Sequence, residues 1–172
     1  MAKRGRKAGK ALSEREPVLE LGPFVQEKLD ELEEFLAEIS GELALRRGGT
    51  QLLGELGHPV ELARKIALSG EDSFTYTVTL NNVLSGLIWA KIMMNEFGDR
   101  VCYVPVFAVL KDARRHGVGR ELFSALEDWV ATKDVSAIEF TTLPGDRHTK
   151  NFCESNGLIA RSLKMHKAIR GR

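Results

Sequence analysis

Long apolar runs, cysteine and aromatic side chains are all scarce in this sequence of 172 residues. No uninterrupted apolar stretch approaches the roughly 20 residues that a membrane-spanning helix needs, so we expect no membrane span. The two cysteines, Cys102 and Cys153, offer neither a disulfide framework nor the spacing of metal ligands, which indicates reduced thiols and no metal site. The charged residues 1–16 lead into no apolar signal-peptide core, so we expect a cytoplasmic protein.

The net charge of +1 hides an uneven distribution along the chain. Residues 1–16 carry +4 and residues 161–172 carry +5, which leaves −8 on the residues between them. With 43% apolar and 28% charged residues, the chain suffices for one domain with a core, which we expect over residues 17–172. The basic residues 1–16 fit a solvated, disordered tail, or an arm that follows nucleic acid or an acidic membrane surface. The first interpretation is favoured because this segment has no aromatic side chain to stack on a base.

The spacing of apolar residues predicts a succession of helices and strands. Apolar residues recur every three or four positions from Val25 to Leu43, which predicts a long helix that Gly48-Gly49 ends. From Phe74 onward they alternate with threonine, which indicates a strand, and Asn81-Asn82 then fits a tight hairpin turn. The predicted elements are, in order, a strand over 17–21, helices over 24–46 and 58–69, strands over 72–79, 84–93 and 101–110, a helix over 118–132, a strand over 136–142, a helix over 148–156 and a strand over 158–169.

The turn between the strand over 101–110 and the helix over 118–132 contains two glycines, Gly117 and Gly119. Glycine lets the backbone approach a ligand closely, and the unpaired N–H groups of a first helical turn attract an anion such as phosphate. Basic side chains surround this turn as well: Arg114, Arg115, His116 and Arg120. A phosphate site and a tight bend without any ligand both remain open as interpretations.

Two nucleotide-binding motifs are excluded by the residues that follow this turn. A Walker loop needs Gly-Lys-Ser/Thr at the start of the helix, whereas here Arg120-Glu121 follows Gly119. A dinucleotide fingerprint needs a third glycine at the position of Leu122.

Two motifs at matching separation resemble the GNAT N-acetyltransferase superfamily. The run from Arg114 to Gly119 matches its R/Q-x-x-G-x-G/A acyl-CoA signature, and the run from Asn151 to Leu158 resembles its F-Y-E-K-x-G-F segment. The order of elements over residues 17–169 is also similar, and residues 144–152 and 160–163 resemble a branch common in actinobacteria. The resemblance implies an α/β fold, with a mixed and mostly antiparallel central sheet between flanking helices, and acetyl-CoA as the acyl donor.

The resemblance also implies where the cofactor lies. Backbone N–H groups over 115–120 would hold the pyrophosphate, and the strand edge over 107–109 would pair with the pantetheine arm. In such folds this strand leaves its neighbour at a bulge, which suits Pro105 because proline has no N–H; an ordinary edge position is the alternative. The residues assigned to the cofactor in this way are Phe107, Ala108, Val109, Arg114, Arg115, His116, Gly117, Val118, Gly119, Arg120 and Asn151.

Two departures from the family pattern concern catalysis. Cys153 occupies the position where the family often has a tyrosine that protonates the leaving thiolate, so it is either a general acid or a buried structural cysteine. Pro105 stands near the position of a frequent glutamate base, and no carboxylate lies within 101–110. Deprotonation of the amine then falls to a water relay, to Tyr103, or to a carboxylate from elsewhere. The residues considered besides Cys153 and Tyr103 are Glu71 and Glu96 as carboxylates and His148 as a site residue or a solvated histidine.

These observations lead to three hypotheses of function. The first is an acetyl-CoA-dependent N-acetyltransferase that acts on a primary amine of a small molecule or a protein. The second is a regulatory module that binds acyl-CoA with little turnover. The third is acetylation or binding of a nucleic-acid-linked substrate through the basic ends of the chain. A homodimer is a further expectation, because strand-mediated dimers are frequent in such families.

Overall fold

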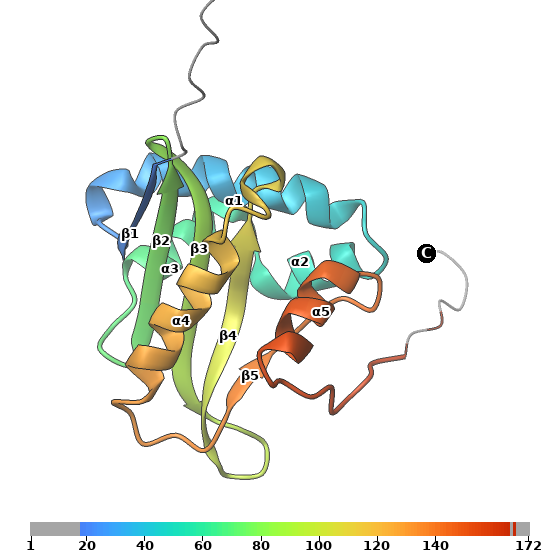
Figure 1. Cartoon of the computed structure of the whole chain (residues 1–172). Coiled ribbons are helices and arrows are strands. Elements are labelled where there is room, and N and C mark those ends of the chain that lie inside the picture. Colours follow the sequence, from blue (N-terminus) through green and yellow to red (C-terminus); the bar gives the residue numbers. More distant parts are fainter. Residues whose placement is uncertain (1–17, 166, 168–172) are drawn as a thin grey trace, which may run out of the picture.

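The computed structural model describes residues 18–165 and residue 167, which form a sheet with helices on both faces (Figure 1). The predicted basic tail over 1–16 lies outside the described residues. The strands are β1 (Leu19–Pro23), β2 (Ser73–Leu80), β3 (Val83–Met94), β4 (Arg100–Val109) and β5 (Ile138–Phe140). The helices are η1 (Gln26–Lys28), α1 (Leu29–Ala44), α2 (Gly49–Leu56), α3 (Pro59–Ala67), η2 (Lys111–Ala113), α4 (Val118–Val130) and α5 (Arg147–Ser155). None of the described helices is both long and apolar enough to cross a membrane.

The five strands stand in the sheet in chain order, β1 to β5. The pairs β1–β2, β2–β3 and β3–β4 are antiparallel, and β4–β5 is parallel. Asn81 and Asn82, at φ of 52° and 65°, form the tight turn between β2 and β3, as the sequence predicted. The mixed, mostly antiparallel α/β fold is therefore confirmed.

Two apolar clusters cover the two faces of the sheet, and β3 contributes to both. Because side chains alternate along a strand, Leu87 and Trp89 face α1 and α3, whereas Ile88 and Ala90 face α4. In the view of Figure 1, α1 and α3 lie behind the sheet and α4 lies in front of it. The central strands are consequently buried on both faces, which keeps the strands that carry the site in place.

A bulge interrupts β4 at its proline. Trp89 of β3 stands opposite Val106 and Lys91 opposite Tyr103, so that Ala90 alone faces both Val104 and Pro105. An extra residue on one strand breaks the ladder locally, and the missing N–H of proline costs nothing there. The bulge predicted at Pro105 is confirmed.

The glycine pair after α1 turns the chain rather than ending the helical region. The sequence predicted no helix between Gly48-Gly49 and residue 58, but α2 begins at Gly49. Gly48 has φ of 82°, and a Cβ on Gly49 would lie 1.7 Å from the carbonyl oxygen of Leu43. Both glycines are therefore needed so that α2 can pack directly against the end of α1.

The predicted closing strand over 158–169 is wrong for the residues that the structure describes. Residues 158–165 and 167 form no strand, and the rest of that range lies outside the described residues. Ile159, Leu163 and Met165 are exposed, so this stretch has no buried face to hold it in a sheet register. The preceding strand, β5, is also shorter than the predicted 136–142, at Ile138–Phe140.

Candidate functional site

Beyond the bulge, β4 presents a backbone edge that no other described strand covers. β5 pairs only with Cys102, Tyr103 and Val104, so it leaves β4 at the bulge. The N–H of Leu110 donates to the carbonyl oxygen of Ser85 on β3 at 2.9 Å. Because the polar groups of an antiparallel strand alternate in direction, the N–H groups of Phe107 and Val109 point away from β3, toward the open edge. An extended ligand can pair with this edge as an added strand would.

The turn after β4 forms a small cradle of backbone N–H groups. Arg115 and Gly117 adopt left-handed conformations, with φ of 74° and 83°, and Gly117 is the N-cap of α4. Within the described part of the chain, no oxygen accepts a hydrogen bond from the N–H of Arg115, Gly117, Val118 or Gly119. Free N–H groups at a helix N-terminus, next to residues of alternating backbone hand, bind anions such as phosphate.

The side chains around this cradle agree with an anion site. Arg115, His116 and Arg120 are exposed, so their N–H groups are free to approach a phosphate. Gly117 has no heavy atom within 4 Å of the position that a Cβ would take, which leaves open space over the turn. Val118, by contrast, is buried at the start of α4, and only its backbone N–H faces the cradle.

Four phenylalanine rings form an aromatic floor between α4, α5 and the two strands that separate. Phe107 of β4 stacks on Phe152 of α5, with ring centroids 5.0 Å apart, and meets Phe140 of β5 edge-on at 5.7 Å. Phe123 of α4 meets Phe152 edge-on at 5.8 Å. A Cβ on Gly119 would lie 3.5 Å from the Phe107 ring, so the glycine turn rests directly on this floor.

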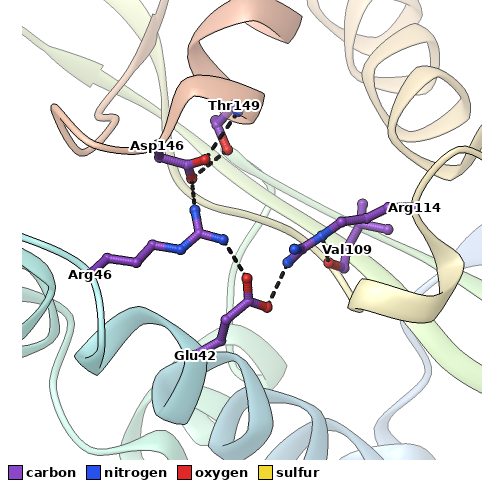
Figure 2. Close-up of polar contacts among 6 residues, drawn as sticks. All are labelled: Glu42, Arg46, Val109, Arg114, Asp146 and Thr149. Carbon is purple, nitrogen blue, oxygen red and sulfur yellow. Dashed lines mark hydrogen bonds and ion pairs between the residues drawn. The ribbon is translucent and has the colours of Figure 1, made fainter.

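The side chain of Arg114 enters a chain of four charged groups, as Figure 2 shows. Its Nε donates to the carbonyl oxygen of Val109 at 3.0 Å, and its Nη2 donates to Oε2 of Glu42 at 2.6 Å. Arg46 donates to the other oxygen of Glu42 and pairs with Oδ2 of Asp146 at 2.5 Å. The side chain predicted to bind the cofactor is thus engaged within the protein.

Electrostatics keep the carboxylate of Glu42 ionised. The hydrogen bond from Arg114 and that from Arg46 lower the pKa of Glu42, against the opposite effect of partial burial. Asp146 also accepts hydrogen bonds from Thr149, at the backbone N–H and at the hydroxyl, and so caps the N-terminus of α5. Neither carboxylate is free to act as a base.

Sequence reasoning did not single out Glu42, Arg46 or Asp146. One signal was present: Phe35, Ile39, Glu42 and Arg46 share one face of the predicted helix, so its buried face ends in two charges. Nothing in the sequence, however, identifies Arg114 as the partner of Glu42, which lies 72 residues earlier.

The two predicted catalytic residues lie on different elements, Cys153 on α5 and Tyr103 on β4, and no hydrogen bond joins them in the described structure. Cys153 is buried on α5, where burial and then the negative charge of Asp146 raise the pKa of its thiol. Burial is what a structural cysteine requires, and the role of general acid stays a prediction. The Tyr103 hydroxyl lies 3.3 Å from Oγ1 of Thr141, beside the point where β5 leaves β4.

The remaining candidates are exposed. Asn151 and His148 lie on the surface of α5, and Glu71 and Glu96 lie in the loops before β2 and after β3. Those two loops are at the opposite end of the sheet from the turn over 114–119 (Figure 1). Among the described residues, no group of three histidine, cysteine, aspartate or glutamate side chains could hold a metal ion.

Comparisons with known proteins agree with this geometry. A family model described as the acetyltransferase (GNAT) family matches residues 29–158. A putative acetyl transferase from Pyrococcus furiosus is 22% identical, with a TM-score of 0.68 over 88% of this chain and 100% of that chain. The aminoglycoside N-acetyltransferase AAC(6′)-Iy in complex with CoA is 17% identical, with a TM-score of 0.67 over 93% of this chain and 100% of that chain.

A third solved structure is an aminoglycoside acetyltransferase from an uncultured soil metagenomic sample, in complex with sisomicin. It is 16% identical to this chain, with a TM-score of 0.61 over 90% of this chain and 97% of that chain. No curated protein matches the sequence. These structures share the fold, and the family model spans well over half of the chain, including β4, the amide cradle and α5. The chain belongs to the GNAT acetyltransferase family.

Proposed function

We propose that this protein is an acetyl-CoA-dependent N-acetyltransferase that moves an acetyl group to a primary amine of a small molecule or a protein. One observation carries the proposal: the amide cradle over 115–119 and the open edge of β4 adjoin each other on one strand and the turn that follows it. A phosphate group and an amide-bearing arm are the two parts of CoA that such a pair of sites suits. The family match supports the same donor.

Each part of the donor has residues that would hold it. The N–H groups of Arg115, Gly117, Val118 and Gly119 would bind the pyrophosphate, with the exposed side chains of Arg115, His116 and Arg120 nearby. The backbone of Phe107, Ala108 and Val109 would pair with the pantetheine arm, over the floor of Phe107 and Phe152. When bound, acetyl-CoA supplies a thioester carbonyl for direct attack by the amine.

Among the described residues, β4 itself supplies no carboxylate that could act as the general base at the bulge. No carboxylate lies within β4, and Glu42 and Asp146 are engaged by arginines. Deprotonation of the amine then falls to water, to Tyr103, which lies beside the separation of β4 and β5, or to a carboxylate from another element, such as Glu139, which stands opposite Tyr103 on β5. The buried thiol of Cys153 keeps its proton at neutral pH, as a general acid must.

Thermal unfolding with and without acetyl-CoA tests the donor site. At about 100 times its dissociation constant, acetyl-CoA should stabilise the folded protein by about 2.7 kcal/mol. Gly117→Glu should abolish this gain, because it adds a negative charge to the cradle and places a residue with a Cβ in a left-handed backbone conformation. Gly98→Glu is the matched control: Gly98 has φ of 85° and the same open surroundings, but lies in the loop between β3 and β4.

The outcomes separate the hypotheses. A gain in wild type and in Gly98→Glu, lost in Gly117→Glu, supports acetyl-CoA binding at the cradle. Release of CoA thiol with an amine from a broad panel then supports transfer, whereas tight binding without any release points to the regulatory module. No stabilisation of a folded wild type by acetyl-CoA would overturn the proposal.

A further inference from the structure

We propose that Glu42 is a positioning residue for the donor site: acting through Arg114, it holds the start of the amide cradle against the end of β4. This inference rests on the proposed function and names a residue outside both family motifs. It also gives Arg114 a different role from the one expected from the sequence, that of a support for the cradle in place of a phosphate ligand.

The contacts of Arg114 join three elements. Its backbone lies between η2, which ends at Ala113, and the left-handed residue Arg115, where the cradle begins. Its side chain donates to Val109, the last residue of β4, and to Glu42, near the end of α1. The segment that enters the cradle is therefore tied both to the strand behind it and to a helix across the sheet.

Glu42 connects the other side of the donor site as well. Its second oxygen accepts from Arg46, and Arg46 pairs with Asp146, the N-cap of α5 (Figure 2). The α5 helix carries Phe152, one ring of the aromatic floor. Through the two arginines, the carboxylate of Glu42 is thus linked both to the cradle before α4 and to the start of α5. The aromatic floor lies between these two helices.

The environment of this chain of charges favours a specific geometry. The exposed fractions of the side chains are 31% for Glu42, 33% for Arg114, 21% for Arg46 and 12% for Asp146. Partly buried, charge-assisted pairs are stronger and more directional than the exposed pairs of a protein surface. Both oxygens of Glu42 are used, so a neutral side chain at this position cannot satisfy both arginines.

The position of Val109 relates this network to donor binding. The carbonyl oxygen of Val109 lies on the open edge of β4, and Arg114 donates to it there. The side chain of Arg114 therefore lies at the end of the edge that is available to an extended ligand. The same hydrogen bond to Val109 keeps this side chain away from the phosphate cradle. If Glu42 is neutralised, Arg114 loses its ionic partner. The spacing between the open edge of β4 and the cradle is then no longer fixed.

A double-mutant cycle on acetyl-CoA affinity, measured by calorimetry, tests this inference. Glu42→Gln and Arg114→Gln should each weaken acetyl-CoA binding by about tenfold, and the double variant should be no weaker than either single one, since residues in one network are not additive. Glu38→Gln is the matched control, because Glu38 is exposed one turn earlier on α1 and belongs to no ion pair of the described structure. In turnover assays the KM for acetyl-CoA should rise by the same factor, with a smaller change in kcat.

Each outcome of the cycle supports or overturns the inference. Unchanged affinity in Glu42→Gln, or additive losses in the double variant, would overturn it while the proposed function stands. Failure of folded wild type to bind acetyl-CoA would overturn the proposed function and the inference with it. If Glu42→Gln does not fold, Arg114→Gln alone decides, and wild-type affinity in that variant would contradict the proposed role.

Discussion

Both cysteine thiols are held in their protonated form by burial, although the two residues belong to different parts of the molecule. Cys102 on β4 is fully buried in the cluster under α4, and burial raises the pKa of its thiol to about 11. Cys153 on α5 is buried next to Phe152 of the aromatic floor, and its pKa is raised by burial and by Asp146. Neither thiol is a nucleophile near neutral pH, since the thiolate is the reactive form.

The raised pKa of Cys102 predicts a loss of stability in alkaline solution. Between an unfolded pKa of 9.0 and a folded pKa of about 11, the unfolded chain releases a proton that the native protein retains. The free energy of unfolding should therefore fall as the pH rises from 9 to 11, by up to about 1.4 kcal/mol per pKa unit. Urea titrations across this range measure it, and Cys102→Ala should show a shallower decline. Parallel declines in the two proteins would contradict this assignment.

At the scale of elements, one glycine sets the distance between α4 and the sheet. Gly86 of β3 stands opposite Val109, the end of the open edge. A Cβ on Gly86 would lie 2.5 Å from Cγ1 of Val118 and 3.1 Å from Cδ1 of Leu122. Val118 is the first residue of α4 and follows the cradle directly. The close approach of Val118 to Gly86 therefore fixes the distance between the cradle and the sheet.

Gly86→Ala should force α4 away from the sheet. Overpacking of this kind lowers stability by about 1–3 kcal/mol. We expect a lower urea midpoint together with weaker binding of acetyl-CoA, because the helix and the cradle move as one element. Gly22→Ala on β1 serves as control, since no heavy atom lies within 4 Å of a Cβ there. Equal midpoints for Gly86→Ala and wild type would show that the close packing of α4 is not required.

At the scale of the whole molecule, the two apolar clusters share β3 and β4 and should unfold together. Trp89 belongs to the cluster under α1 and α3, whereas Trp129 packs against the cluster under α4. The two tryptophans are the only ones in the sequence, so each can report one face of the sheet. Loss of one helical layer would expose an apolar face of the same central strands on which the other layer packs, so neither layer is independent of the other.

Single-tryptophan variants test this cooperativity. In Trp129→Phe the fluorescence reports the face of α1 and α3, and in Trp89→Phe it reports the face of α4. Within each variant the fluorescence and circular dichroism transitions in urea should coincide, as a two-state transition requires. A fluorescence midpoint that precedes the circular dichroism midpoint in one variant would show that this face unfolds first.

Local patterns predicted most of the sheet and the position of the cradle. The alternation that starts at Phe74, the asparagine pair at 81–82 and the two glycines of the cradle all act on neighbouring residues, and the structure has them in the expected places. Sequence reasoning was wrong where local signals were ambiguous. Gly48-Gly49 could end a helix or turn the chain into another, and the apolar residues after Leu158 could form a strand only with a partner and a buried face.

The sequence by itself determined the family, the strand-turn-helix unit and the proline at which β4 bulges, because each depends on residues that are neighbours in the chain. Only the tertiary structure decided the direction of Arg114, the carboxylate that meets it and the edge of β4 that stays open. The contact between Glu42 and Arg114 spans 72 positions. Such contacts follow from how whole helices pack on the sheet, and the hydrophobic effect that drives this packing is non-directional, so the pattern of a single segment does not specify its polar partners.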